Sequence, residues 1–357
     1  MYKKFFMGIA AMAALTLVSC SSDDLNSLSD NSSKNEAISF DGYLGRSAVA
    51  VNGSRGSVLD KDALQNSTKG FGVFGNYNST GGQNFGANLF NNQQVTYSST
   101  PGTESKKWRY DNVKYWPAQG HIDFLAYAPY NAGTFENTYC LNFTVSPTIT
   151  EQKDLLWAKA VGQTKNTISS TENKVKFKFD HALSRLGYTV KLKEDYKNVN
   201  IKLKKITLAG TDTDPKAPAF YTKGTIDLST DQWSTLPTDA KQYFEWFSGE
   251  KPVTFVKPAS EDKPVSNPTT DYLFVIPQDF SKGNKNNDNL YVIVEYTIQN
   301  GTTETMTSTV SSKIEDNFEQ GKAYTINLTI GLTPIDFDVE VVNGWVDDNT
   351  IPEIPLN

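Results

Sequence analysis

The chain has 357 residues, and its 34 Lys and Arg stand against 40 Asp and Glu, which gives a formal charge of −6 at pH 7. This acidic balance argues against nucleic acid as a partner, because nucleic-acid binding depends on cationic side chains that neutralise phosphates. Only two cysteines and two histidines are present. We therefore expect no disulfide in the mature protein, no metal site and no cofactor.

The N-terminus has the pattern of a secretory signal. Lys3 and Lys4 precede an uncharged run at residues 5–18, which is too short to cross a bilayer as a helix. The end of the run, Leu17-Val18-Ser19-Cys20, resembles a bacterial lipobox. The resemblance implies removal of residues 1–19 and lipidation of Cys20, which would anchor the protein stably in the outer membrane. The alternative is an ordinary signal followed by a free cysteine.

Residues 20–36 are rich in Ser, Asn and Asp, a composition that predicts a flexible tether rather than a folded segment. The acidic pair Asp23 and Asp24 resembles the surface-export signal of Bacteroidota lipoproteins; alternatively it is only part of a solvated linker. Removal of the signal takes away Lys3 and Lys4 and leaves 32 basic against 40 acidic residues, a formal charge of −8.

Beyond the tether, short segments with period-2 alternation are separated by Gly, Asn, Pro and Ser clusters, the pattern of an all-β sandwich or barrel. The expected strands include residues 70–77, 113–116, 122–127, 139–145, 175–179, 186–193, 199–208, 272–276, 290–298 and 323–330. The best candidate for a helix is only the short segment Asp180–Arg185. In the strand at residues 186–193, we expect Tyr188, Val190 and Leu192 to face the core and Thr189 to face water.

A polar stretch at residues 163–174 separates two apolar series of strands. It predicts an N-terminal domain at residues 37–165, a C-terminal domain at residues 170–346 and a short tail at residues 347–357. Each domain has a common size for a β-sandwich.

Several motifs together resemble the fimbrillin family of Bacteroidota, the subunits of protease-assembled pili and related surface lipoproteins. They are Ile38-Ser39-Phe40, Gly70-Phe71-Gly72-Val73-Phe74, Val113-Lys114-Tyr115-Trp116-Pro117, the run at residues 122–129, the run at residues 179–186, Phe274-Val275-Ile276-Pro277-Gln278 and the run at residues 318–328. The resemblance covers nearly the whole mature chain. It implies two tandem transthyretin-like β-sandwich domains and a structural or adhesive role at the cell surface, with other fimbrial subunits and a host protein or glycan as partners.

The resemblance also implies an assembly step. In polymerising members, a trypsin-like protease cuts behind the first strand, whose removal leaves an apolar groove for a strand of the next subunit. Here Ile38, Phe40, Gly42 and Leu44 match such a groove-filling strand, and the cut would fall between Arg46 and Ser47, with Arg55 as a second candidate. Alternatively, Arg46 is an ordinary loop residue.

The donor end of the chain departs from the pattern. Residues 335–341 alternate as a strand should, but Pro352 and Pro355 in the tail each remove a ladder donor. This favours a tip, an anchor or an unpolymerised surface relative over a bulk shaft subunit.

Catalytic chemistry has little support in the sequence. His121 and His181 lie outside any metal-ligand spacing, and we expect a turn residue and a structural histidine. The acids Asp111, Asp123, Asp180 and Glu245 could supply a glycosidase pair, but the simpler interpretation is solvated or strand-edge acids. The aromatic clusters at residues 108–116 and 243–247 could bind glycans in a monomeric surface lipoprotein, although in a sandwich without disulfides we expect them in the core.

Overall fold

The computed structural model describes residues 37–44, 59–99, 105–197, 199–234, 240–255, 265–266, 272–300, 303–331 and 336–342. These ranges contain the strands β1 to β24, the α-helix α1 (Lys61–Asn66) and two short 3-10 helices, η1 (Ile149–Glu151) and η2 (Ser169–Thr171). The predicted all-β class is confirmed. In this part of the chain, no helix has the length and apolar content that crossing a membrane requires.

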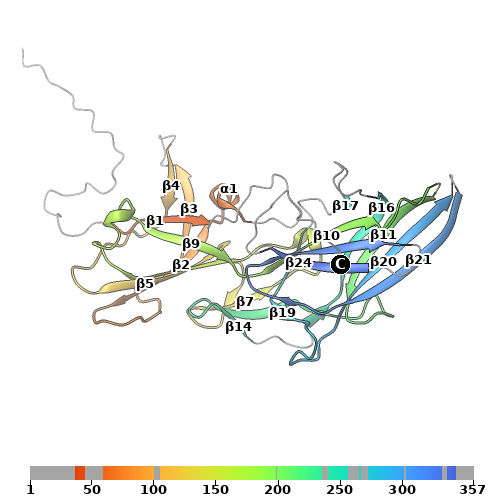
Figure 1. Ribbon diagram of the computed structural model, residues 1–357. Coiled ribbons are helices and arrows are strands. Elements are labelled where there is room, and N and C mark those ends of the chain that lie inside the picture. Colours follow the sequence, from red (N-terminus) through yellow and green to blue (C-terminus); the bar gives the residue numbers. More distant parts are fainter. Residues whose placement is uncertain are drawn as a thin grey trace, which may run out of the picture.

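The N-terminal sheet has seven strands in the order β1-β9-β8-β5-β2-β3-β4 (Figure 1). Their bounds are β1 Phe40–Leu44, β9 Val175–His181, β8 Leu156–Gln163, β5 His121–Ala128, β2 Phe71–Asn78, β3 Phe90–Ser99 and β4 Lys106–Arg109. Neighbouring strands are antiparallel except for β1 and β9, which run parallel. Strand β1 therefore lies at one edge of the sheet, beside a strand far away in the sequence.

The two edges of this sheet approach each other because it curls around its core. Past the end of β4, the backbone oxygen of Lys114 accepts a hydrogen bond from Ile38 N at 2.8 Å, and Tyr115 forms a single antiparallel bridge with Ala37. The curled sheet encloses an aromatic N-terminal core, whose members include Ile38, Phe40, Phe71, Phe90, Phe124, Phe177 and Phe179.

Strand β2 is buried on both faces, which explains its glycine-rich sequence. Phe71 and Val73 enter the N-terminal core, whereas Phe74 enters a different core on the opposite face. At Gly72, an added Cβ would lie 2.3 Å from Cε1 of Tyr127. The ring of Tyr127 can cross the strand at this point only because Gly72 has no side chain.

The C-terminal half is a β-sandwich. One sheet has the order β17-β10-β23-β24, with β18 also paired to β10, and the other has the order β16-β11-β20-β21. Their bounds are β17 Val265–Ser266, β10 Ser184–Leu192, β23 Ala323–Ile330, β24 Asp336–Val342, β18 Leu273–Val275, β16 Phe244–Val253, β11 Val199–Ala209, β20 Leu290–Asn300 and β21 Thr303–Ile314. Between the sheets lies the C-terminal core, which includes Tyr188, Leu203, Phe244, Val292 and Ile326.

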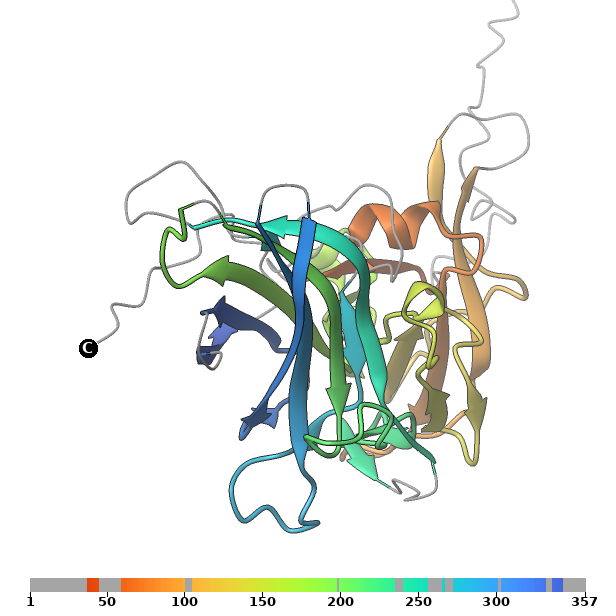
Figure 2. The same ribbon diagram turned by 90° about the vertical axis from the view of Figure 1, so that its right-hand side faces the viewer.

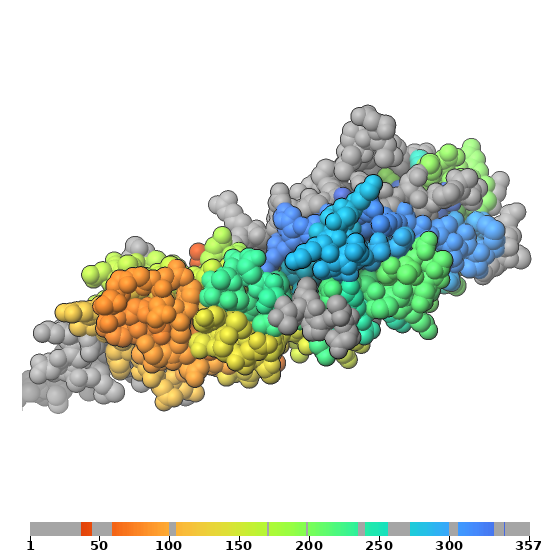
Figure 3. Space-filling model, turned by 90° about the horizontal axis from the view of Figure 1, so that it is seen from below, coloured from red at the N-terminus to blue at the C-terminus, as the bar shows by residue number. Residues whose placement is uncertain are grey.

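A third sheet, in the order β14-β13-β7-β6, joins the two halves. Strands β6 (Thr134–Phe135) and β7 (Cys140–Thr144) come from the N-terminal half, while β13 (Lys223–Asp227) and β14 (Gln232–Ser234) come from the C-terminal half. This sheet helps to enclose a junction core, whose members include Phe74, Leu125, Leu141, Ile226, Phe274 and Ala323. In Figure 3, the yellow and blue-green segments of this region lie together in the middle of an elongated molecule.

Two small ribbons complete the fold: β12 (Phe220–Tyr221) with β15 (Lys241–Gln242), and β19 (Gln278–Asp279) with β22 (Asn317–Phe318). Figure 2 views the molecule from its C-terminal half, with the orange strands of the N-terminal half behind. The pairings place β9 in the N-terminal sheet, although the expected domain boundary at residues 165–170 lies before it. The two domains and their limits stay a prediction.

The predicted helix at Asp180–Arg185 is wrong. Strand β9 ends at His181 and β10 begins at Ser184, and the buried residues Ala182 and Leu183 cross between their sheets. Ala182 N donates to Leu155 O and Ala182 O accepts from Trp233 Nε1, each at 2.8 Å, so partners outside this segment hold its backbone. So short a helix would gain little against these contacts.

Helix α1 was not expected, yet its sequence carries a start signal. The side chain of Asp60 caps the helix by accepting a hydrogen bond from Ala63 N at 2.6 Å, and Leu64 is buried beneath it.

Two further expectations are wrong. The segment at residues 113–116 is not a strand, since only Tyr115 makes an isolated bridge. Thr189 is 6% exposed rather than solvated, and its hydroxyl donates to Asn327 Oδ1 on the neighbouring strand β23. The inward positions Tyr188, Val190 and Leu192 are confirmed.

Candidate strand-exchange site

Strand β1 is held along one side by β9. The two strands pair in parallel over five positions, from Phe40 beside Val175 to Leu44 beside Phe179. Because neighbours in a parallel pair point to the same face, the even-numbered residues of β1 turn inward together with Val175, Phe177 and Phe179. The alternating apolar side chains therefore fix the register of β1.

Phe40 is the centre of this packing. It is 2% exposed, and its ring centroid lies 5.4 Å from Phe90, 5.3 Å from Tyr110, 5.6 Å from Phe124 and 5.7 Å from Phe177. Ring pairs at such separations contribute roughly 0.5–1.5 kcal/mol beyond their burial. We call residues 175–179 of β9, which pair with β1, and these four rings the β1-binding surface.

The remaining residues of β1 complete the alternation. At Gly42, an added Cβ would lie 3.1 Å from Cε2 of Phe179, so the strand backbone passes directly over that ring. Leu44 packs against the N-terminal core, while Tyr43 points outward and is 40% exposed.

Tyr110 holds the other side of the segment. Its hydroxyl donates to Ile38 O at 2.7 Å and accepts from Lys114 N at 3.2 Å. Burial raises the pKa of Tyr110 to about 12, against a smaller lowering by the Lys114 hydrogen bond. Ile38 itself is 1% exposed.

The next described residue after β1 is Leu59, and hydrogen bonds fix the chain again at this point. Leu59 N donates to Asp154 Oδ2 at 3.0 Å, and Nδ1 of His181 lies 2.8 Å from the same oxygen. Asp154 is fully buried and His181 is 6% exposed. His181 therefore serves the structure, as expected, and ties the end of β9 to the start of the segment that carries α1.

The candidate processing residues Arg46, Ser47 and Arg55 lie outside the described residues, as do Cys20, the whole of the expected tether at residues 20–36 and the tail at residues 347–357. Of the expected site residues, the structure brings together Ile38, Phe40 and Leu44, all on the inner side of the β1 segment.

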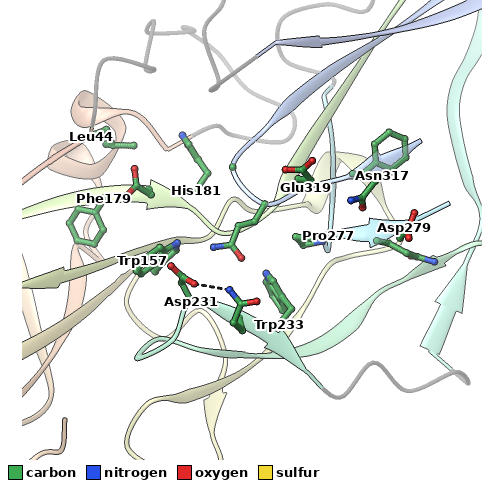
Figure 4. A pocket seen from close by; sticks show the side chains of 16 residues that line it. Leu44, Trp157, Phe179, His181, Asp231, Trp233, Pro277, Asp279, Asn317 and Glu319 are labelled. Carbon is green, nitrogen blue, oxygen red and sulfur yellow. Dashed lines mark hydrogen bonds between the residues drawn. The ribbon is translucent and has the colours of Figure 1, made fainter. Parts of the chain in front are cut away.

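A cleft of about 730 Å³ opens where β1 ends. We call it the junction cleft; its lining residues are Leu44, Trp157, Phe179, Asp180, His181, Asp231, Gln232, Trp233, Pro277, Gln278, Asp279, Asn317, Phe318, Glu319, Gln320 and Gly321. Figure 4 shows Leu44, Phe179 and Trp157 on one side and Pro277, Asp279 and Asn317 on the other. Both halves of the molecule thus contribute to the cleft.

Three of the acids in the cleft interact with nearby donors. Asp231 Oδ1 accepts from Gln232 Nε2 at 2.8 Å, Asp279 Oδ1 accepts from Ser281 N at 2.8 Å, and Glu319 pairs with Lys322 at 2.6 Å. Sequence reasoning named Leu44, Asp180 and His181 as separate candidates and did not place them in one cleft, because no local pattern links the strands that line it.

The other acids named from the sequence lie apart. Asp111 is exposed, and Glu245 pairs with Lys205 at 3.2 Å on the surface. Asp123 is 1% exposed, so its interpretation as a solvated or strand-edge acid is wrong. It accepts from Asn78 Nδ2, Asn84 N and Gly162 N at 2.7–2.9 Å and fixes the loops around His121, the first residue of β5.

The aromatic clusters lie mostly in the cores, as expected. Trp116, Phe244 and Trp246 are buried, while Trp108, Tyr110 and Phe247 pack against the cores; Tyr115, 53% exposed, and the half-buried Tyr243 are the exceptions. Among the residues that the structure describes, no group of three or more His, Cys, Asp or Glu could hold a metal ion, and Cys140 forms no disulfide.

The fold and the site define an elongated protein of β-sheets whose first described strand lies at a sheet edge, packed into an aromatic core. The chain belongs to the fimbrillin-like family, whose model matches residues 58–345. The resemblance seen in the sequence is thereby confirmed.

One solved fimbrial structure shares the fold, and two others are similar at lower TM-scores. A fimbrial protein from Bacteroides vulgatus has 21% sequence identity and a TM-score of 0.63, over 87% of this chain and 99% of that chain. A putative cell adhesion protein from Bacteroides uniformis has 16% identity and a TM-score of 0.49 over the same shares. The tip fimbrial protein Mfa3 from Porphyromonas gingivalis has 12% identity and a TM-score of 0.35, over 76% and 93%. No curated protein matches the chain in sequence.

Proposed function

We propose that this protein is a structural subunit of a surface fimbrium, or an adhesin-like relative, that is anchored through lipid on Cys20 and assembled by protease-triggered strand exchange. Membership of the fimbrillin-like family supports the class of function. The observation that carries the mechanism is the packing of β1: a short edge strand with inward apolar side chains, held by one neighbouring strand and a cluster of rings.

A cut in the chain would change how strongly β1 is held. While β1 is covalently joined to the body, its effective concentration at the β1-binding surface is roughly millimolar or higher. After a cut at Arg46, the strand is retained only by its own non-covalent contacts. A strand of a neighbouring subunit can then compete for the same backbone ladder and the same apolar positions.

The described residues favour a cut between Leu44 and Leu59. Leu44 ends β1, while Leu59 is held by Asp154 and Asp60 caps α1. These contacts do not depend on the chain connection to β1, so the body after the cut keeps its first anchored residue. Because Cys20 precedes β1, displacement of the strand would also release the body from its lipid.

Strand β24 is an unsuitable donor to another subunit. It pairs with β23 over seven positions and so completes its own sheet. A donor would have to come from the tail at residues 347–357, where Pro352 and Pro355 oppose a long strand. We therefore propose that this protein receives a strand more readily than it gives one, as a tip subunit would; in an anchor role it would instead keep β1 and its lipid.

Limited trypsin digestion of the mature protein tests this proposal. We expect a folded product that begins at Ser47, has lost residues 38–44 and forms multimers more readily than the uncut protein. Intact-mass measurement identifies the cut, and size-exclusion chromatography measures the multimers.

The matched variants are Arg46→Gln, which should keep β1 and remain monomeric, and Arg55→Gln, which should behave as the unaltered protein does. A cut product that stays monomeric and retains residues 38–44 would contradict strand exchange. If trypsin cuts the Arg46→Gln variant after Arg55 and the same multimers form, the processing site is Arg55 and the strand-exchange mechanism is retained.

A further inference from the structure

The junction cleft continues the line of β1. The ladder between the two strands ends at Leu44 and Phe179, and β9 runs on through Asp180 and His181. All four residues line the cleft. At about 3.3 Å per residue, a strand two residues longer than β1 would extend some 7 Å along β9 and enter the cleft.

The far wall of the cleft belongs to the C-terminal half. It includes Asp231, which precedes β14, and Trp233, which lies on β14. It also includes Asp279 and Glu319 at the β19–β22 ribbon. In Figure 4, Asp231 and Trp233 lie opposite Leu44 across the opening. A segment that leaves the β1-binding surface in this direction therefore meets residues of both halves.

The chemistry of the cleft suits a cation. Four carboxylates line it, those of Asp180, Asp231, Asp279 and Glu319, and no Lys or Arg is among the lining residues. Lys322 neutralises Glu319 from outside the lining, which leaves an acidic excess.

Of the two indoles in the cleft, that of Trp233 is open to a cation and that of Trp157 already has one beside it. The hydrogen bond from Trp233 Nε1 to Ala182 O fixes the ring of Trp233, which is partly exposed. Lys159 already lies over Trp157, with its Nζ 5.2 Å from the ring centroid. Arginine and lysine are the side chains that can use both an aromatic face and carboxylates.

We propose that the strand of a neighbouring subunit that replaces β1 is longer than β1, and that it places a basic side chain, arginine or lysine, in the junction cleft. This inference rests on the proposed strand exchange. It adds a charge requirement to a groove that otherwise selects only alternating apolar side chains.

Peptides that copy the first strand test the inference. The probes are labelled amidated peptides with the sequence of residues 37–44, either unextended or extended at the C-terminus by two lysines, two glutamines or two glutamates. Fluorescence anisotropy measures their affinity for the trypsin-cut chain. Exposed ion pairs and cation–π contacts are each weak interactions. We therefore expect the lysine peptide to bind about fivefold more tightly than the glutamine peptide, and the glutamate peptide to bind more weakly than both. The preference should shrink at high salt, because the cleft is open to solvent.

Charge-removing variants of the cleft provide the second readout. The double variant Asp180→Asn with Asp231→Asn should abolish the preference for lysine while leaving the affinity of the unextended peptide unchanged. The control is Asp212→Asn, at an exposed position outside the cleft lining, which should keep the preference. A preference that survives in the double variant would overturn the assignment to the cleft.

The outcomes separate the two proposals. If the unextended peptide fails to bind the cut chain, strand exchange is refuted and this inference falls with it. If that peptide binds but the three extended peptides bind equally, only the inference is overturned. Equal binding together with a change of tryptophan fluorescence on addition of maltotriose would assign the cleft to a neutral sugar instead.

Discussion

Phe40 meets four rings of the β1-binding surface at once. Truncation would leave a cavity that these rings cannot all collapse into, since they are fixed on different strands. We expect Phe40→Ala to lower the free energy of unfolding by about 3–5 kcal/mol. Urea unfolding followed by tyrosine and tryptophan fluorescence measures the change.

The control for this prediction lies three residues away on the same strand. Tyr43 is 40% exposed and points away from the core, so Tyr43→Ala should change stability by no more than about 0.5 kcal/mol. Equal losses in the two variants would show that side-chain packing does not hold β1.

Three tyrosines make stability depend on alkaline pH. Burial raises the pKa values of Tyr110, Tyr127 and Tyr324 to about 12, whereas the unfolded chain loses these protons near pH 10. Between these values the folded state binds more protons than the unfolded state, so stability falls as pH rises. We expect the free energy of unfolding to decline from about pH 10 towards pH 12.

Urea unfolding at several pH values measures this decline. Tyr110→Phe should make it shallower, and at neutral pH the variant should lose only the hydrogen bonds with Ile38 O and Lys114 N, a cost of about 2 kcal/mol. A stability that stays constant between pH 10 and 11 would contradict the prediction.

At the scale of elements, alternation was enough to predict strands whose pattern is regular. The segments expected at residues 122–127, 175–179 and 323–330 all lie within strands. Prediction failed where contacts distant in sequence decide the backbone. Ala182 and Leu183 look helical locally, but they form a bend between two strands. Their side chains are buried, and hydrogen bonds join Ala182 to Leu155 and Trp233 and join Leu183 O to Gly321 N.

The candidate strand-exchange site could be predicted only in part. The alternation of Ile38, Phe40 and Leu44 identified the inner face of the first segment. No local pattern announced that its partner would be β9, more than a hundred residues away, or that the pair would be parallel. The junction cleft could not be predicted, since Trp157, Trp233 and Glu319 come together only through the packing of three separate sheets.

At the scale of the whole molecule, the junction core couples the two halves. It draws Phe74 and Leu125 from the N-terminal sheet and Phe274 and Ala323 from the C-terminal half. Unfolding of either half would expose this core, so we expect one cooperative transition, with equal calorimetric and van't Hoff enthalpies. Differential scanning calorimetry makes the comparison.

Two matched variants sharpen this test. Phe274→Ala in the junction core should separate the transition into two, whereas Phe244→Ala in the C-terminal core should lower the melting temperature but keep one transition. Two transitions in the unaltered protein would mean that the halves are energetically independent.

The ladder between β7 and β13 has a mechanical consequence. Five residue pairs connect a strand of one half to a strand of the other. A pulling force on one end of the molecule is therefore transmitted to the opposite end by backbone hydrogen bonds as well as by the polypeptide chain. Each molecule should thus behave as a stiff rod. In a filament built from such rods, compliance would be concentrated at the contacts between successive molecules.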